Sequence, residues 1–123
     1  MTLVIDASVA VNAVHQGGVD LGDGALHAPD LIDYEVVSAL RRMSQRADLT
    51  PSQARDALDL FGSLRISRHP GGDLRDRIWT LRHDLSVYDA SYVALAEALG
   101  MPLVTADRRL AASARRYCEV IAI

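Results

Sequence analysis

Four acidic side chains fall at the borders of apolar segments, where a strand is expected to end or a helix to begin: Asp6, Glu35, Asp89 and Asp107. A carboxylate beside a hydrophobic core costs free energy unless another group compensates its charge. Two bare carboxylates about 4 Å apart repel by roughly 4 kcal/mol at an effective dielectric constant of about 20. A shared cation removes this repulsion, so the four residues together suggest a metal centre.

The four candidate ligands offer only oxygen atoms, and an all-oxygen ligand set suits Mg²⁺ or Mn²⁺. An ion held in this way can activate a water molecule and stabilise the attacking and leaving oxygens of a phosphodiester. The pattern therefore predicts a metal-dependent nuclease. Ser8 and Thr105 flank the expected site and could hold a water molecule or a phosphate oxygen, although helix capping is an equally good role for Ser8.

Each acid also has an ordinary structural explanation when it is considered alone. Asp89 can be the acidic partner in a capping box that begins at Ser86, and Asp107 can stabilise a helix start through the helix dipole. Glu35 can be a solvated helix residue, whereas a polar residue directly after a buried strand, such as Asp6, commonly lines a ligand-binding edge. The argument for a metal site therefore rests on the joint placement of the four residues.

The elements that must position these residues alternate along the chain. Short, continuously apolar runs predict strands at residues 3–6, 26–28, 64–69, 103–105 and 120–123. Helical spacing and start signals predict helices at residues 7–14, 30–46, 50–62, 73–83, 86–99 and 107–117. Such an alternation indicates an α/β fold with a parallel sheet that is covered on both faces. The length of 123 residues fits one domain, spanning 1–123.

Three local signals define expected helix ends. Asp30 is a candidate N-cap for the second helix. Thr50 and Gln53 form a capping-box pair, with Pro51 at the first helical position. Gly100 is expected to end the helix before it in a left-handed conformation.

The composition limits the classes of protein that the chain can represent. Half of the residues are hydrophobic, but no apolar run approaches the ~20 residues of a membrane span, and no secretory leader is recognisable. The cytoplasm is therefore the expected location. The formal charge of −3 argues against a protein that coats nucleic acid by bulk electrostatics, although all 13 basic residues are arginine and could form local phosphate-binding patches. Cys118, the one cysteine, excludes an internal disulfide and a multi-cysteine zinc site.

Four segments carry a family resemblance, and their order and spacing extend over nearly the entire chain. They are VIDAS at 4–8, AP at 28–29 followed by YEVVSAL at 34–40, YDASYVALAE at 88–97, and LVTAD at 103–107. With these segments the sequence resembles the PIN-domain ribonucleases, and more closely the VapC toxins of bacterial toxin–antitoxin pairs.

The resemblance implies a PIN-like three-layer α/β/α fold with a short-stranded, mostly parallel central sheet. It implies that Mg²⁺ or Mn²⁺ is held by Asp6, Glu35, Asp89 and Asp107, and that Thr105 assists them as part of the catalytic set. It also implies endonucleolytic cleavage of RNA, a VapB-type antitoxin partner and a homodimeric toxin.

Two positions depart from the family pattern. Ser38 stands where members often have asparagine, which affects a contact around the site and not a metal ligand. The segment around Asp107 offers one acid where some relatives offer two close together. The number of metal ions therefore stays open.

Other functions are compatible with an acidic pocket that follows the first strand. A phosphatase of the haloacid-dehalogenase kind needs a second aspartate two positions after Asp6, where this chain has Ser8. A receiver-like signalling module needs a lysine, and the chain has none. The serious alternative is a non-catalytic PIN module that binds RNA or protein. Retention of all four acids argues against it.

The sequence offers several candidates for contacts with RNA and with a partner protein. RNA could be guided by arginines that are equally well explained as solvated helix residues: Arg41, Arg42, Arg46, Arg108 and Arg109. The loop at 15–24 is expected to help select the RNA, whose class the sequence leaves open. The apolar helix pair between Leu31 and Leu64 can serve core packing or an antitoxin helix. Trp79 is assigned to the core or to a dimer interface, not to base stacking.

Overall fold

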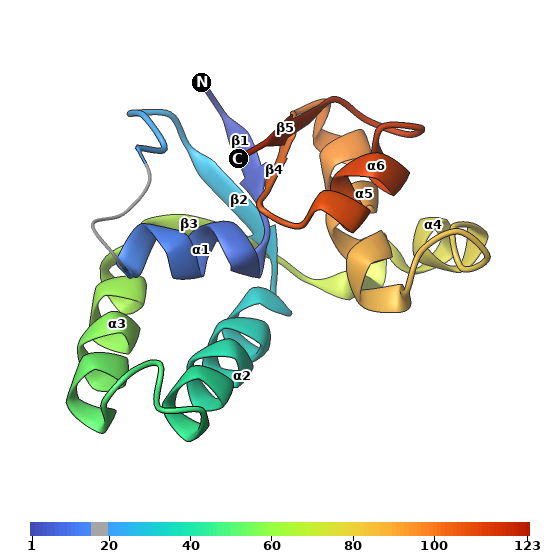
Figure 1. Cartoon of the computed structure of the whole chain (residues 1–123). Helices are drawn as coiled ribbons and strands as arrows, with labels where there is room; N and C mark the ends of the chain where they lie inside the picture. The colour runs from blue at the N-terminus through green and yellow to red at the C-terminus, as the bar shows by residue number, and fades with distance from the viewer. Residues whose placement is uncertain (16–19) are drawn as a thin grey trace.

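In the computed structural model, which describes residues 1–15 and 20–123, a parallel sheet occupies the centre of the molecule (Figure 1). The strands are β1 (Leu3–Ile5), β2 (Leu26–Pro29), β3 (Ile66–His69), β4 (Leu103–Thr105) and β5 (Val120–Ala122). Their spatial order is β3-β2-β1-β4-β5, and every neighbouring pair is parallel. The sequence predicts a mostly parallel sheet, whereas this sheet is parallel throughout.

The helices cover both faces of the sheet. They are α1 (Ala7–Val14), α2 (Ile32–Gln45), α3 (Pro51–Ser63), α4 (Arg75–Thr80), α5 (Val87–Leu99) and α6 (Arg108–Ala114), with a 3₁₀ turn, η1, at Gly71–Asp73. Helix α5 packs across β1, β2 and β4, while α6 packs against β4 and β5. Helices α2 and α3 form an antiparallel pair that also packs against α1 (Figure 1). No helix in the described part of the chain is long and apolar enough to cross a membrane.

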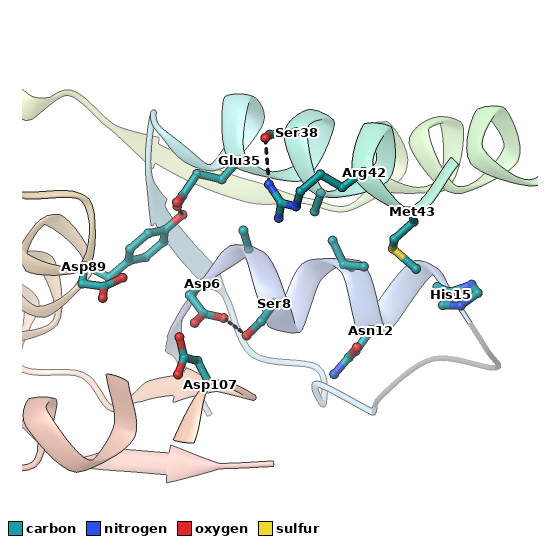
Figure 2. A pocket seen from close by; sticks show the side chains of 14 residues that line it. Asp6, Ser8, Asn12, His15, Glu35, Ser38, Arg42, Met43, Asp89 and Asp107 are labelled. Carbon is teal, nitrogen blue, oxygen red and sulfur yellow. Dashed lines mark hydrogen bonds between the residues drawn. The ribbon is translucent and has the colours of Figure 1, made fainter. Parts of the chain in front are cut away.

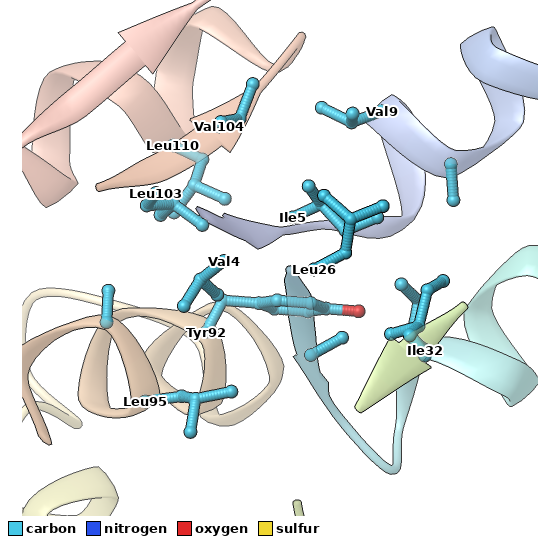
Figure 3. Packing of buried hydrophobic residues seen from close by; sticks show 14 of the residues in the cluster. Val4, Ile5, Val9, Leu26, Ile32, Tyr92, Leu95, Leu103, Val104 and Leu110 are labelled. Carbon is cyan, nitrogen blue, oxygen red and sulfur yellow. The ribbon is translucent and has the colours of Figure 1, made fainter. Parts of the chain in front are cut away.

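The side chains of β1 show why the strands are continuously apolar. Val4 points toward Tyr92 on α5, while Ile5 points toward Val9 on α1, on the opposite side of the strand (Figure 3). All four side chains are almost completely buried. A strand that is covered on both faces has no solvent-facing positions, so its sequence does not alternate between apolar and polar residues. The three-layer α/β/α arrangement predicted from the sequence is therefore confirmed.

Most helix ends agree with the local sequence signals. Thr50 and Gln53 form both hydrogen bonds of a capping box in front of Pro51. Gly100 ends α5 with a φ of 63°, a left-handed conformation that glycine adopts without steric cost. The prediction for Asp30 was wrong, because α2 begins after Leu31 without a side-chain cap and the Asp30 backbone carbonyl accepts from the Asp33 N–H instead.

Two helices are shorter than their sequence patterns predict. The segment at 73–83 begins with the last residue of η1 and contains only the short α4, after which the chain turns before α5 begins. The last helix ends at Ala114, and the Tyr117 N–H then bonds to the Ala114 carbonyl at 2.9 Å. This is the tighter spacing of a 3₁₀ turn, which satisfies the last carbonyl groups of a helix. Apolar periodicity continues through such turns, so it overestimates helix length.

The buried strand β4 provides a test of the core. Leu103 is 0% exposed, whereas Leu60 on α3 is 54% exposed. We expect Leu103→Ala to lower the free energy of unfolding by about 2–5 kcal/mol, because it removes apolar contacts and leaves a cavity. The same change at Leu60 should cost about 0.5 kcal/mol or less. Urea unfolding followed by circular dichroism measures both, and equal losses would contradict the placement of Leu103 in the core.

Candidate metal centre

The four acidic residues identified from the sequence line a single pocket of about 460 Å³. It lies at the carboxyl ends of the neighbouring strands β1 and β4, which are followed by Asp6 and by the Ala106–Asp107 pair. Asp89 and Glu35 enter the pocket from the first turns of α5 and α2. Figure 2 shows the four side chains grouped at one end of the pocket.

Asp6 is the most constrained of the four acids, with a relative exposure of only 5%. Its Oδ1 atom accepts hydrogen bonds from the Ser8 hydroxyl at 2.6 Å and from the Val9 N–H at 3.1 Å. Its Oδ2 atom accepts a hydrogen bond from the buried Thr105 hydroxyl. The bond to Val9 also caps α1. Three donors from two elements therefore fix the orientation of this carboxylate.

Ser8 and Thr105 join α1 to the segment that follows β4. Besides donating to Asp6, the Ser8 hydroxyl accepts from the Ala106 N–H at 3.0 Å. The Thr105 hydroxyl accepts from the Asp107 N–H at 2.9 Å. Ser8 lines the pocket, whereas Thr105 is completely buried behind Asp6. Both hydroxyls thus orient acidic residues, and the cap of α1 is Asp6 and not Ser8.

Glu35 is held by a residue that the sequence did not single out. The Tyr92 hydroxyl donates to Glu35 Oε1 at 2.7 Å, although the two residues are 57 positions apart. The ring of Tyr92 is buried in the core, and its hydroxyl reaches the pocket. The sequence could have indicated Tyr92 through its spacing from Asp89. Tyr92 follows Asp89 by three positions on α5, so both side chains lie on the same side of that helix.

The Asp107 carboxylate takes part in a helix start, as its ordinary structural explanation requires, whereas only half of the capping box expected at Ser86 and Asp89 forms. Asp107 Oδ1 accepts from the backbone N–H groups of Arg109 and Leu110 and so caps α6. At α5 the cap is Ser86, whose hydroxyl accepts from the Asp89 N–H at 3.1 Å. Both acids nevertheless line the pocket. Capping and a position in the pocket are therefore compatible for Asp107, while no cap hydrogen bond is formed by the Asp89 carboxylate among the described residues.

Burial and mutual repulsion make the clustered carboxylates costly to ionise. Burial raises the pKa of Asp6, although hydrogen bonds from Ser8, Thr105 and Val9 oppose the shift. Burial also raises the pKa of Glu35, and the charges of Asp89 and Asp6 add to it. The pKa of Asp89 is raised by burial and then by the charges of Asp107 and Asp6. The acids therefore sense one another's charge, as an uncompensated cluster must.

The donor set suits a hard divalent cation. The four acids supply carboxylate oxygens around one pocket, the ligand type that Mg²⁺ and Mn²⁺ prefer. Within residues 1–15 and 20–123, no three acidic, histidine or cysteine side chains are oriented to enclose one ion on their own. Mg²⁺ usually keeps several water ligands and binds protein through one or two carboxylates. The arrangement therefore fits an ion that reaches part of the cluster through water.

The pocket continues away from the acids, between α1 and α2. This part is lined by Asn12 on α1, by His15 directly after that helix, and by Ser38, Arg42 and Met43 on α2 (Figure 2). The structure thus distinguishes among the arginines that the sequence left equivalent.

Of those arginines, only Arg42 lines the acidic pocket. Arg41 lies in a separate groove between α2 and α3. Arg109 is exposed at the start of α6, close enough to oppose the rise in the pKa of Asp89. The loop that was expected to help select RNA lies partly outside the described residues, because these omit 16–19.

Comparison with known proteins identifies close relatives. The model of the PIN domain family matches residues 3–116. The chain is 43% identical over 124 residues to VapC ribonuclease Mb0985 of Mycobacterium bovis, and the match covers 98% of each chain. It is 41% identical over 125 residues to ribonuclease VapC1 of Mycobacterium tuberculosis, with 95% of this chain and 94% of the relative covered.

Two solved structures share the fold. The crystal structure of PAE2754 from Pyrobaculum aerophilum matches with a TM-score of 0.71 at 23% identity, covering 98% of this chain and 83% of that one. VapBC2 from Rickettsia felis, bound to a DNA fragment from its promoter, matches with a TM-score of 0.65 at 15% identity, covering 99% and 98%. At these identities the likeness concerns the fold alone.

The repulsion within the cluster predicts that Asp89→Asn stabilises the metal-free protein. The raised pKa of Asp89 means that its charged form is less favourable in the folded state than in the unfolded chain. Removing that charge should raise the free energy of unfolding by about 1 kcal/mol. The gain should disappear as the pH falls through this pKa, because the wild-type carboxyl then takes up a proton.

Urea unfolding in the presence of EDTA, at neutral and at mildly acidic pH, measures the difference. Asp48→Asn is the control, because Asp48 is exposed in the connection between α2 and α3 and does not line the pocket. An Asp89→Asn variant that is less stable than wild type at neutral pH would contradict the repulsion.

Proposed function

We propose that this chain, which belongs to the VapC ribonucleases of the PIN-domain family, is a metal-dependent endoribonuclease toxin. It cleaves RNA phosphodiester bonds in the cytoplasm and is neutralised by a VapB-type antitoxin. The observation that carries the proposal is the convergence on one pocket of Asp6, Glu35, Asp89 and Asp107. Residues 1–123 act as one catalytic domain.

In this proposal the four carboxylates would hold Mg²⁺ or Mn²⁺, hard ions that prefer oxygen ligands. When bound, the ion supplies a Lewis acid and lowers the pKa of a water molecule that can attack a phosphodiester. This assignment is supported by the all-oxygen character of the cluster and by the raised pKa values of Asp6, Glu35 and Asp89. A nearby cation would relieve the repulsion that these shifts report.

The surrounding residues orient the carboxylates. Ser8, Thr105 and the backbone of Val9 hold Asp6 in one orientation, so little motion is needed before a ligand binds. The Tyr92 hydroxyl does the same for Glu35. Because the pKa values of these acids are raised, protonation competes with cation binding as the pH falls. Activity should therefore decline on the acidic side of neutral pH.

An apolar groove between α2 and α3 supports the assignment of an antitoxin partner. Its walls include Val37, Leu40, Ala54 and Leu58, with Arg41 and Arg55 also lining it. Val37 is 49% exposed although it is hydrophobic. A groove between two helices can receive the apolar face of a third, which is a common way to bind a helical partner.

A homodimer is the assembly that we propose for the toxin. Trp79 is 65% exposed on α4, so of the two roles considered from the sequence the core is excluded and the dimer interface remains a proposal. Val87 and Tyr88 at the start of α5 are 57% and 61% exposed. Large exposed apolar side chains in neighbouring elements are typical of surfaces that bind another protein.

The proposed activity requires both the metal and the acidic cluster. In a single-turnover assay with end-labelled RNA, we expect Asp89→Asn to lower the cleavage rate by at least about 100-fold, because it removes a metal-binding carboxylate. The RNA should contain a site located by sequencing RNA 5′ ends after induced expression. EDTA should abolish cleavage by the wild type, and added Mg²⁺ or Mn²⁺ should restore it.

Asp48→Asn serves as the control and should cleave at the wild-type rate, since Asp48 does not line the pocket. Full metal-dependent cleavage by folded Asp89→Asn protein would refute the assignment of this site. A wild type that binds RNA but never cleaves it, with or without metal, would instead favour the non-catalytic PIN module.

The groove between α2 and α3 can be tested separately from catalysis. We expect Val37→Asp to weaken the complex with the cognate antitoxin at least about tenfold, because it places a charge in an apolar contact. RNA cleavage by the free toxin should be unaffected. Leu60→Asp is the matched control, since Leu60 is also exposed but does not line this groove. Calorimetry with purified antitoxin measures both, and equal affinities for the two variants would exclude the groove.

A further inference from the structure

The acidic pocket is one end of a trough between α1 and α2. Its α1 wall carries Ser8, Val11 and Asn12, with His15 directly after the helix, and its α2 wall carries Glu35, Ser38, Ala39, Arg42 and Met43. Within each helix these residues recur at intervals of three or four positions, so they form one continuous face. From Glu35 to Arg42 the axis of α2 advances by roughly 10 Å. The trough therefore has an acidic end and, about two helical turns away along α2, an arginine.

Arg42 lies over the trough and reaches back toward the acids. Its Nη1 atom donates to the Ser38 hydroxyl at 3.0 Å, and Figure 2 shows the guanidinium between Ser38 and the centre of the pocket. Its charge opposes the rise in the pKa of Glu35. It is the one arginine among the described residues that line this pocket. The bond to Ser38 thus directs the guanidinium toward the trough.

The charge of Arg42 is available for an anionic ligand. Its side-chain hydrogen bond goes to a neutral hydroxyl, whereas Arg55, Arg68 and Arg77 each form an ion pair with a carboxylate. A guanidinium has five N–H donors, and the bond to Ser38 occupies one of them. The remaining donors form a fork that matches two oxygens of a phosphate.

A nuclease with this pocket must also overcome an electrostatic problem. Four carboxylates at the cleavage site repel a polyanionic strand, and a single divalent ion offsets only part of their charge. A cation fixed beside the cluster would attract a neighbouring phosphate and hold the strand against this repulsion.

The rest of the trough lining suits a base of the RNA. In addition to Arg42, the trough offers apolar contacts at Val11 and Met43 and polar groups at Asn12 and His15. Such a lining suits an unpaired base, which can pack and form hydrogen bonds.

We propose that Arg42 binds a backbone phosphate next to the scissile one, in a single-stranded RNA that lies along the trough between α1 and α2. This inference rests on the proposed ribonuclease function. On this inference, the preference for single-stranded RNA comes from the α1–α2 side of the metal centre. The RNA strand also approaches the metal centre from that side.

Single-turnover cleavage at increasing protein concentration tests the assignment, with the same end-labelled RNA and with Mg²⁺ present. We expect Arg42→Gln to raise the half-saturating protein concentration about tenfold, the loss of one charge-assisted contact. Its maximal rate should change less than threefold. The slope of log affinity against log salt concentration should fall in magnitude by about 0.7, the value for one phosphate of a single strand. Arg42→Lys should keep the wild-type slope, because the charge remains.

Arg46→Gln is the matched control, since Arg46 is exposed at the end of the same helix and does not line the pocket. Its half-saturating concentration should stay within twofold of wild type. Thermal unfolding verifies that the variants are folded. We expect them to fold because the Arg42 side chain is exposed.

Three outcomes would overturn the inference while leaving the ribonuclease function intact. The first is a half-saturating concentration for Arg42→Gln equal to that of Arg46→Gln. The second is an Arg42→Gln variant in which only the maximal cleavage rate falls. The third is a salt dependence of RNA affinity that Arg42→Gln leaves unchanged. A wild type that fails to cleave RNA under any metal condition would overturn the proposed function itself, and this inference with it.

Discussion

Repulsion among carboxylates at the carboxyl end of the sheet is the constraint around which this molecule is built. Parallel topology brings the ends of β1 and β4 together, and with them Asp6 and Asp107. Helices α5 and α2 then add Asp89 and Glu35 to the same pocket. Burial and mutual repulsion raise the pKa of three of these four residues. An arrangement of this kind lowers stability, which is common where function requires clustered charge.

The rest of the structure compensates for this cost in two ways. Hydrogen-bond donors on the core side of the cluster orient two of the acids. The main donors are the hydroxyl of Thr105, which bonds to Asp6, and that of Tyr92, which bonds to Glu35. The open side of the cluster faces the trough between α1 and α2, where Arg42 places a positive charge. Donors that hold the acids thus come from buried strands and helices, while the groups available to a ligand come from helix surfaces. This division lets a rigid core support a site that stays accessible.

The features that the sequence predicted correctly are those encoded locally. Buried apolar runs followed by an acid predicted that Asp6 and Asp107 lie after strands, at one edge of the sheet. Local capping and turn signals predicted the start of α3 at Thr50 and the end of α5 at Gly100. Features that depend on tertiary contacts were not predictable in this way. The bond between Tyr92 and Glu35 joins residues 57 positions apart, and Arg41 and Arg42 line different pockets although they are neighbours in the sequence. The choice among five equivalent arginines therefore required the fold.

The central claim is that four acids from distant segments form one cation site, and calorimetric titration of the wild-type protein with Mn²⁺ at neutral pH tests it most directly. The account predicts saturable binding that weakens as the pH falls, because protonation of the carboxyls with raised pKa values competes with the ion. Asp6→Asn, Glu35→Gln, Asp89→Asn and Asp107→Asn should each weaken this binding at least about tenfold. Absence of binding, or binding that none of the four substitutions affects, would contradict the account.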